Sequence, residues 1–348
     1  MKFPESISLT ITNHCNLRCQ MCGQWSEEGY IRHNTESLKH EMSLADWKHV
    51  VGEAAAHNIS SLLLRGGEIF MFPGIIDLLE YIHAKGIFIS IDTNGTLLEQ
   101  YAEDIVSIGN IHLTISVDGP EPVHDEVRGV SGTFQRMKDG LSLLAKLENK
   151  GGNKISRSIC FTISQYNYRS LAVMPQVARS LGLHSIAIVP YYYFPDSVGQ
   201  RYEEELHSLG CHAFAWVGFH HEDSGVDFNE FQRQYRQYLA NLGNIGNYPY
   251  MPLDEELYRA WFSDALTPVG PRNCQNIEKL IDIQPDGSAN FCVDFVDYSF
   301  GNVREATIAG LWNNERAERF RHYRREQPLA VCQRCGAKYM SQAWSNYG

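Results

Sequence analysis

Short apolar runs alternate with amphipathic stretches along residues 1–200. The short runs predict strands at residues 7–12, 61–64, 88–92, 112–117, 158–163 and 185–189. The stretches between them carry apolar residues at helical spacing and predict helices. Strands that alternate with helices predict a parallel sheet, because a helix makes each return crossing of the sheet. Six such units predict an α/β fold, an open partial (β/α)6 TIM-like barrel whose sites gather at the C-terminal strand ends.

Local signals indicate where several of these helices begin and end. Ser43, with Asp46 three residues later, resembles a capping box. We expect Pro73 at the first position of the next helix, with Gly86 ending that helix. Thr133 is predicted to cap a later helix.

The pattern changes after the sixth predicted strand. Residues 201–270 predict a helical connecting region with a Gly- and Asn-containing break at 243–247. In residues 271–348, alternating positions on both sides of a Pro-Asp-Gly turn at 285–287 predict a hairpin, and residues 307–323 predict one helix. The chain therefore divides into a barrel over residues 1–200, the connecting region, and a small C-terminal α+β domain over residues 271–348.

Composition and charge narrow the classes of function. A length of 348 residues suits one large domain with a small appendage. The formal charge of -11 argues against nucleic-acid or membrane partners, because their anionic surfaces select clustered Lys and Arg. No secretory signal or membrane span is evident, and the nine cysteines form metal-ligand spacings rather than a disulfide framework. We therefore expect an oxygen-sensitive cytoplasmic protein.

Three of these cysteines follow the first predicted strand at C-x3-C-x2-C spacing: Cys15, Cys19 and Cys22. Three thiolates can ligate three irons of a 4Fe-4S cluster and leave the fourth iron open, because the next cysteine is the distant Cys160. A zinc site or three buried thiols are the alternatives. Structural zinc favours four ligands in paired C-x2-C arrangements, so the spacing favours the cluster.

With this motif the chain resembles the radical S-adenosylmethionine enzymes. The resemblance implies that the amino and carboxylate groups of S-adenosylmethionine chelate the open iron. An electron from the reduced cluster then yields a 5'-deoxyadenosyl radical, which abstracts a hydrogen atom from the substrate. A flavodoxin or ferredoxin is the electron donor that the resemblance implies.

The resemblance also assigns residues to the S-adenosylmethionine site. Gly66, Gly67 and Glu68 match a Gly-Gly-Glu-Pro motif that accepts the methionyl ammonium, although Ile69 replaces the proline. Thr93 and Asn94, after the third predicted strand, match positions near the methionyl group.

Further positions match the ribose, carboxylate and adenine contacts of that family. Ser116 and Asp118 match positions near the ribose, although Asp118 could equally form a turn or helix cap. Arg128 resembles the arginine that pairs with the methionine carboxylate, and a surface arginine is the alternative. Val189 and Tyr191 belong to a run over residues 189–194 in which at most two of the four aromatic residues are expected to line the adenine and substrate pockets.

A second cysteine set lies in the C-terminal domain: Cys274, Cys292, Cys332 and Cys335. Four thiolates make a closed metal site. Its spacing resembles the shortened SPASM extension called a twitch domain, which implies one auxiliary 4Fe-4S cluster; a structural zinc ribbon is the alternative. A cluster with four protein ligands has no iron free for substrate, so we expect it to transfer electrons.

Two cysteines belong to neither set, and no residue stands out as a general base. Cys160, within the fifth predicted strand, is expected to be a small buried hydrophobe. Cys211 is a candidate hydrogen-atom donor, since radical epimerases use a free thiol in this way, although a structural role is favoured.

We therefore expect a radical S-adenosylmethionine oxidoreductase that oxidises its substrate by two electrons. The substrate is a small-molecule alcohol or sugar, or a peptide undergoing maturation. Peptide maturases often carry a leader-binding domain before the cluster, and the position of Cys15 gives modest weight to a small molecule. A redox-neutral radical epimerase and a non-catalytic iron-sulfur electron carrier are the alternatives.

Overall fold

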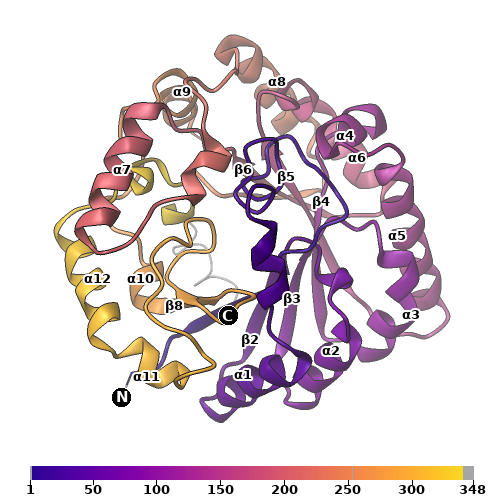
Figure 1. Ribbon diagram of the computed structural model, residues 1–348. Helices are drawn as coiled ribbons and strands as arrows, with labels where there is room; N and C mark the ends of the chain where they lie inside the picture. The colour runs from indigo at the N-terminus through magenta and orange to yellow at the C-terminus, as the bar shows by residue number, and fades with distance from the viewer. Residues whose placement is uncertain (1, 253, 340–348) are drawn as a thin grey trace.

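The computed structural model describes residues 2–252 and 254–339, and its main feature is a curved parallel sheet wrapped by helices (Figure 1). Six parallel strands succeed one another in chain order: β1 Ser6–Thr12, β2 Ser61–Gly66, β3 Phe88–Thr93, β4 Ile111–Ser116, β5 Ser156–Ile163 and β6 Ser185–Pro190. The predicted α/β partial barrel is confirmed. Within the described residues, no helix has the length and apolar character needed to cross a membrane.

The helices between these strands cover the outer side of the sheet (Figure 1). They are α1 Leu44–Ala56, α2 Ile75–Ala84, α3 Leu98–Ile108, α4 Glu121–Arg128, α5 Thr133–Asn149 and α6 Met174–Ser180. The capping box at Ser43 is confirmed, with both reciprocal hydrogen bonds to Asp46 present. Pro73 does not start α2, because Gly74 is its N-cap at φ +86°, while Gly86 at φ +73° follows the helix as predicted. Thr133 is the first residue of α5 rather than its cap.

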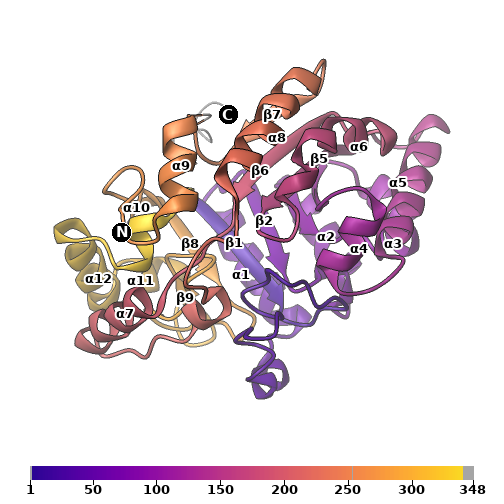
Figure 2. The same cartoon turned by 90° about the horizontal axis from the view of Figure 1, so that it is seen from above.

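Three short strands extend the sheet beyond the predicted six. β7 Gly246–Pro249 pairs with β6, and β8 Leu280–Ile283 pairs in parallel with β1 and antiparallel with β9 Ala289–Asn290. The predicted hairpin is therefore confirmed, and it is joined edge to edge with the first barrel strand (Figure 2). β7 lies where the sequence predicted a break in a helical region, because four residues give too little pattern to recognise a strand.

Most of the remaining helices lie beside the open side of the barrel, whereas the helix at residues 228–241 packs against residues 168–180 on the outer side (Figure 1). In chain order, these helices are α7 Asp196–Ser208, α8 Phe228–Asn241, α9 Glu255–Ser263, α10 Asn276–Lys279, α11 Ile308–Trp312 and α12 Glu315–Glu326. The single helix predicted over residues 307–323 is wrong, because it is divided at Asn313. The Asn314 side chain accepts a hydrogen bond from the Ala317 N–H and so begins a new helix.

The two faces of the barrel sheet differ in chemistry. Residues facing the helices, such as Ile89 and Ile91 of β3, are apolar and fully buried. Their neighbours Ser90 and Asp92 point to the inner side and are only half-buried. The same alternation recurs from strand to strand. We call this inner side the lumen, and its polar lining includes Arg65, Ser90, Asp92, Thr114, Ser116, Ser158, Cys160 and Thr162.

Candidate functional site

The first cysteine set lies in the loop that leaves β1, at the C-terminal edge of the sheet. The Leu17 N–H lies 3.5 Å from the Sγ of Cys15, and the Trp25 N–H lies 3.4 Å from the Sγ of Cys22. Burial raises the pKa of Cys15 to about 12 and that of Cys19 to about 11, and the neighbouring thiols of this set add to both rises. Thiols with raised pKa values stay protonated near neutral pH, and a bound metal ion is what stabilises their thiolate form. The donor set therefore fits an iron-sulfur cluster.

Gly66 and Gly67 bring the end of β2 against this cysteine loop. A Cβ on Gly67 would lie 2.3 Å from the carbonyl oxygen of His14, and one on Gly66, at φ +150°, would lie 2.3 Å from that of Thr12. Both contacts are with backbone, so a larger residue cannot be accommodated by rotating a side chain. The Gly67 and Glu68 N–H groups donate to these same carbonyls at 2.8 Å.

The Glu68 carboxylate is fully buried and held by several donors. It accepts hydrogen bonds from the Thr93 hydroxyl and the Asn94 N–H, each at 2.8 Å, and from the Phe70 N–H at 3.3 Å. Burial raises the pKa of Glu68, and these donors oppose that rise. Thr93 and Asn94 therefore orient Glu68, a positioning role that the sequence did not indicate. Their contact with S-adenosylmethionine stays a prediction.

Asp118 and Arg128 form a buried ion pair beside the first cysteine set. The Arg128 Nε lies 2.6 Å from the Asp118 Oδ2, and the Arg128 Nη1 lies 3.6 Å from the Sγ of Cys19. Arg128 is therefore no surface arginine, and it carries its charge to the edge of the cluster site. Ser116, two residues before Asp118, faces the lumen. The ribose and carboxylate contacts of these residues stay predictions.

The aromatic run at residues 191–194 is divided between the two cysteine sets. The Tyr191 hydroxyl is buried, has no hydrogen-bond partner within the described part of the chain, and lies within electrostatic range of Cys22. The Tyr192 hydroxyl lies 3.5 Å from the Sγ of Cys335. Tyr193 bonds to the Trp261 carbonyl, while Val189 faces the lumen. An unpartnered hydroxyl beside Cys22 is what a polar cofactor at the first set would satisfy.

The four cysteines of the second set converge from three segments of the chain. Cys274 and Cys332 both lie within electrostatic range of Cys335, and Cys332 and Cys335 lie within range of Cys292. Burial raises the pKa of Cys335 to about 12. The Phe295 N–H lies 3.3 Å from the Sγ of Cys292. Four neighbouring thiols, one buried and three partly buried, fit a cluster whose irons all have protein ligands.

In the lumen, carboxylates surround the side chain of Arg65. The Arg65 Nη2 lies 3.7 Å from the Oδ1 of Asp294, which follows Cys292 by two residues. Asp92 and Asp282 also lie within electrostatic range of Arg65. The side chains of Arg65 and Asp294 keep 27% and 24% of their exposure, although protein groups surround them. The sequence analysis missed this group. The alternation of polar and apolar residues in β3 was the signal that could have found Asp92.

The two remaining cysteines lie in different surroundings. Cys160 is half-buried on the lumen face of β5, within electrostatic range of Asp92 and Asp118, rather than in the apolar core. The Sγ of Cys211 accepts a hydrogen bond from the Arg316 Nη2 at 3.0 Å, beside α12. These surroundings of Cys211 do not support the hydrogen-donor role, which stays an untested prediction.

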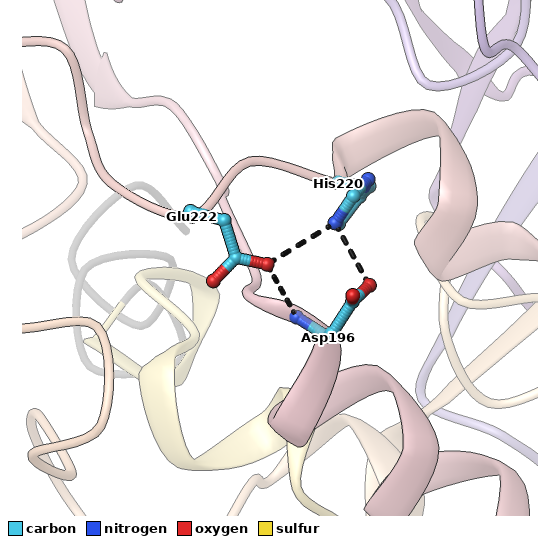
Figure 3. A group of neighbouring side chains, drawn as sticks. All are labelled: Asp196, His220 and Glu222. Atoms are coloured by element: carbon cyan, nitrogen blue, oxygen red, sulfur yellow. Dashed lines mark hydrogen bonds and ion pairs between the residues drawn. The ribbon is translucent and has the colours of Figure 1, made fainter.

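A segment at residues 214–222 packs over the first cysteine loop. A Cβ on Gly218 would lie 2.0 Å from the carbonyl oxygen of Gly23, so the two backbones are in direct contact. The His220 Nε2 lies 3.0 Å from the Oδ1 of Asp196 and 3.5 Å from the Oε1 of Glu222 (Figure 3). Both carboxylates are exposed. We interpret this group as a polar cluster that links the covering segment to the start of α7, where the Asp196 N–H also donates to Glu222.

Comparisons with known proteins agree with this geometry. The profile of the radical SAM superfamily matches residues 9–161, and the profile of an iron-sulfur cluster-binding domain, SPASM, matches residues 274–336. Together the two profiles cover more than half of the chain. They imply S-adenosylmethionine and 4Fe-4S clusters, including an auxiliary cluster.

Individual relatives match parts of the chain. An AdoMet-dependent heme synthase of Methanosarcina barkeri is 28% identical over 58% of this chain and 54% of its own. The sporulation killing factor maturation protein SkfB of Bacillus subtilis is 28% identical over 47% of this chain and 37% of its own. The chain thus spans about half or less of the length of these curated relatives.

A solved structure extends the likeness in fold to nearly the whole chain. SuiB of Streptococcus suis superposes with a TM-score of 0.63 and 14% identity, covering 95% of this chain and 68% of its own. The likeness to SuiB is one of fold. The two profile matches show that the chain belongs to the radical S-adenosylmethionine superfamily and carries a C-terminal SPASM-type domain.

Proposed function

We propose that this enzyme oxidises a substrate held in the lumen by two electrons. The observation that carries the proposal is the contact of Arg65 with Asp294 at 3.7 Å. Arg65 directly precedes the Gly66-Gly67 turn that touches the backbone leading into the first cysteine set, and Asp294 follows Cys292 of the second set by two residues. A substrate beside this contact would have a hydrogen-abstracting group on one side and an electron acceptor on the other.

A two-electron oxidation of the substrate requires one acceptor for a hydrogen atom, one for an electron and one for a proton. S-adenosylmethionine on a cluster held by Cys15, Cys19 and Cys22 would supply a radical able to remove one hydrogen atom from the substrate. A cluster held by the four cysteines of the second set would supply a one-electron acceptor. The third acceptor removes a proton, so that the substrate loses two hydrogens in all. A low-potential donor of the flavodoxin or ferredoxin type supplies the electron that begins each turnover.

Asp92 is our candidate for the proton acceptor. It projects into the lumen from β3, and the Thr114 hydroxyl of the neighbouring strand is its hydrogen-bond partner. Burial raises the pKa of Asp92, and Arg65 opposes that rise. A carboxylate with a raised pKa is a better base near neutral pH than one in water.

Two classes of substrate fit this reaction: a small alcohol or sugar, and a peptide. The hydroxyl and carboxylate groups of the lumen suit a polar substrate of either class. The name of SkfB describes a maturation protein, and SuiB has been solved with a precursor peptide, which supports screening peptides alongside alcohols.

A redox-neutral epimerisation is the second candidate function, and one observation favours it. Cys160 offers a thiol on the lumen face of β5, where it could return a hydrogen atom to a substrate radical. Substrate isomerised without loss of hydrogen, and only when Cys160 is present, would favour this reading over oxidation.

The test of the proposed oxidation is the Asp92→Asn variant. Alcohols and peptides that stimulate 5'-deoxyadenosine formation are first identified with the wild type by chromatography, and their products by mass spectrometry. We expect Asp92→Asn to form 5'-deoxyadenosine but to yield about a hundredfold less oxidised product, since general-base catalysis contributes at least about that factor.

Asp104→Asn, on the exposed face of α3, is the matched control and should oxidise normally. Unchanged oxidation by Asp92→Asn would show that another group accepts the proton. Products that keep all their hydrogens in the wild type would contradict the oxidation itself.

A further inference from the structure

A buried lysine lies against the second cysteine set. Lys338 follows Cys335 by three residues, is 3% exposed, and lies within electrostatic range of Cys335, Cys332 and Cys274. Its Nζ donates a hydrogen bond to the Gln333 carbonyl, 3.2 Å away. Lysines are almost never fully buried without an anionic partner, because removing an ammonium from water is costly. The thiolate sulfurs of a metal-bound second set would add such anionic charge beside Lys338.

Positive charge is concentrated on one side of the second cysteine set. Arg324, also 3% exposed, lies within electrostatic range of Cys274 and Lys338 and donates from its Nη1 to the Gln327 carbonyl at 3.0 Å. The carboxylate of Asp294 lies near Cys292 and Cys335, and Arg65 pairs with it. Two buried cations therefore lie near Cys274, whereas an ion pair lies on the lumen side.

A buried cation has a definite effect on an iron-sulfur cluster. Net charge and burial are among the factors that set the reduction potential of a cluster. Reduction adds one negative charge, so a nearby ammonium stabilises the reduced form more than the oxidised form. In a buried site this attraction is weakly screened by solvent. Lys338 therefore shifts the equilibrium toward electron uptake.

We propose that Lys338 is a positioning residue that raises the reduction potential of the auxiliary cluster and so makes the cluster a better electron acceptor. The inference rests on the proposed oxidation, since only an acceptor role gives a raised potential a function. Its geometric basis is independent of the substrate, because the Lys338 Nζ bonds to the Gln333 carbonyl, between Cys332 and Cys335 of the second set.

A redox titration of the auxiliary cluster alone tests this role. The full chain is prepared with Cys15, Cys19 and Cys22 all replaced by Ala, so that the remaining cluster gives the only spectroscopic signal. In that background, we expect Lys338→Met to weaken reduction at least tenfold, a fall of about 60 mV for a one-electron couple. Lys338→Arg should keep most of the wild-type potential, because it keeps the charge.

Lys279→Met is the matched control. Lys279 is an exposed lysine of the same domain, with its Nζ 3.3 Å from Glu5, and its loss should leave the potential unchanged. If Lys338→Met fails to bind iron, Lys338→Gln is titrated in its place. An unchanged potential in the neutral variant, or an equal fall in Lys279→Met, would overturn the role of Lys338 while leaving the oxidation intact. If the second cysteine set of the wild type holds no iron, the proposed oxidation itself is contradicted.

Discussion

Cys19→Ala should reduce 5'-deoxyadenosine formation to the background of the reductant alone. Cys19 is buried, and its Sγ lies 3.6 Å from the Nη1 of Arg128. A three-cysteine site with one sulfur removed cannot hold three irons, so the fourth is no longer presented to S-adenosylmethionine. The measurement is chromatographic quantification of 5'-deoxyadenosine after anaerobic reduction of reconstituted protein with excess S-adenosylmethionine.

Cys211→Ala is the control for this experiment. Its thiol lies beside Arg316, so we expect 5'-deoxyadenosine to form at the wild-type rate. Wild-type cleavage by Cys19→Ala would mean that the cysteine loop does not hold the catalytic cluster. Loss of cleavage in Cys211→Ala would show that our interpretation of its surroundings is wrong.

Arg128→Met should destabilise the protein by about 3–5 kcal/mol, the usual cost of leaving a buried charge without its partner. The Asp118 carboxylate is fully buried and lies 2.6 Å from the Arg128 Nε. Methionine has similar volume but no charge, so the carboxylate would remain in a low-dielectric environment without a cation. Chemical denaturation of the cofactor-free protein, followed by circular dichroism, measures the change in free energy of unfolding.

Arg236→Met is the matched control for the buried pair. Arg236 is 63% exposed and lies 2.9 Å from Glu255, so its removal should leave the unfolding transition unchanged. A double Asp118→Asn/Arg128→Met variant should recover part of the loss, because it leaves no buried charge. Equal unfolding midpoints for Arg128→Met and Arg236→Met would contradict a stabilising role for the pair.

The barrel could be predicted from the sequence because its strands and helices are long enough to show their periods. The first cysteine loop was found from its C-x3-C-x2-C spacing, and the Gly66-Gly67-Glu68 turn was found because it follows a predicted strand. Short elements were missed for the opposite reason: β7 has four residues, and the break at Asn313 interrupts a continuous amphipathic pattern.

The lumen group could not be assembled from the sequence because its members are far apart along the chain. Arg65 and Asp294 meet only because β8 joins the edge of β1 and carries the second cysteine set to the barrel. That pairing joins strands that lie far apart in the sequence, and no local pattern specifies it. Likewise, Arg128 has the sequence context of a surface residue, and its burial follows from the pairing with Asp118.

The measurement that tests the account most directly is iron and sulfide content after anaerobic reconstitution. Wild type is compared with the variant in which Cys15, Cys19 and Cys22 are all replaced by Ala. Two 4Fe-4S clusters predict about eight irons in the wild type and about four in the variant. A fall from about four irons to none would mean that the second cysteine set holds no cluster. That result would contradict the auxiliary acceptor and, with it, the proposed oxidation.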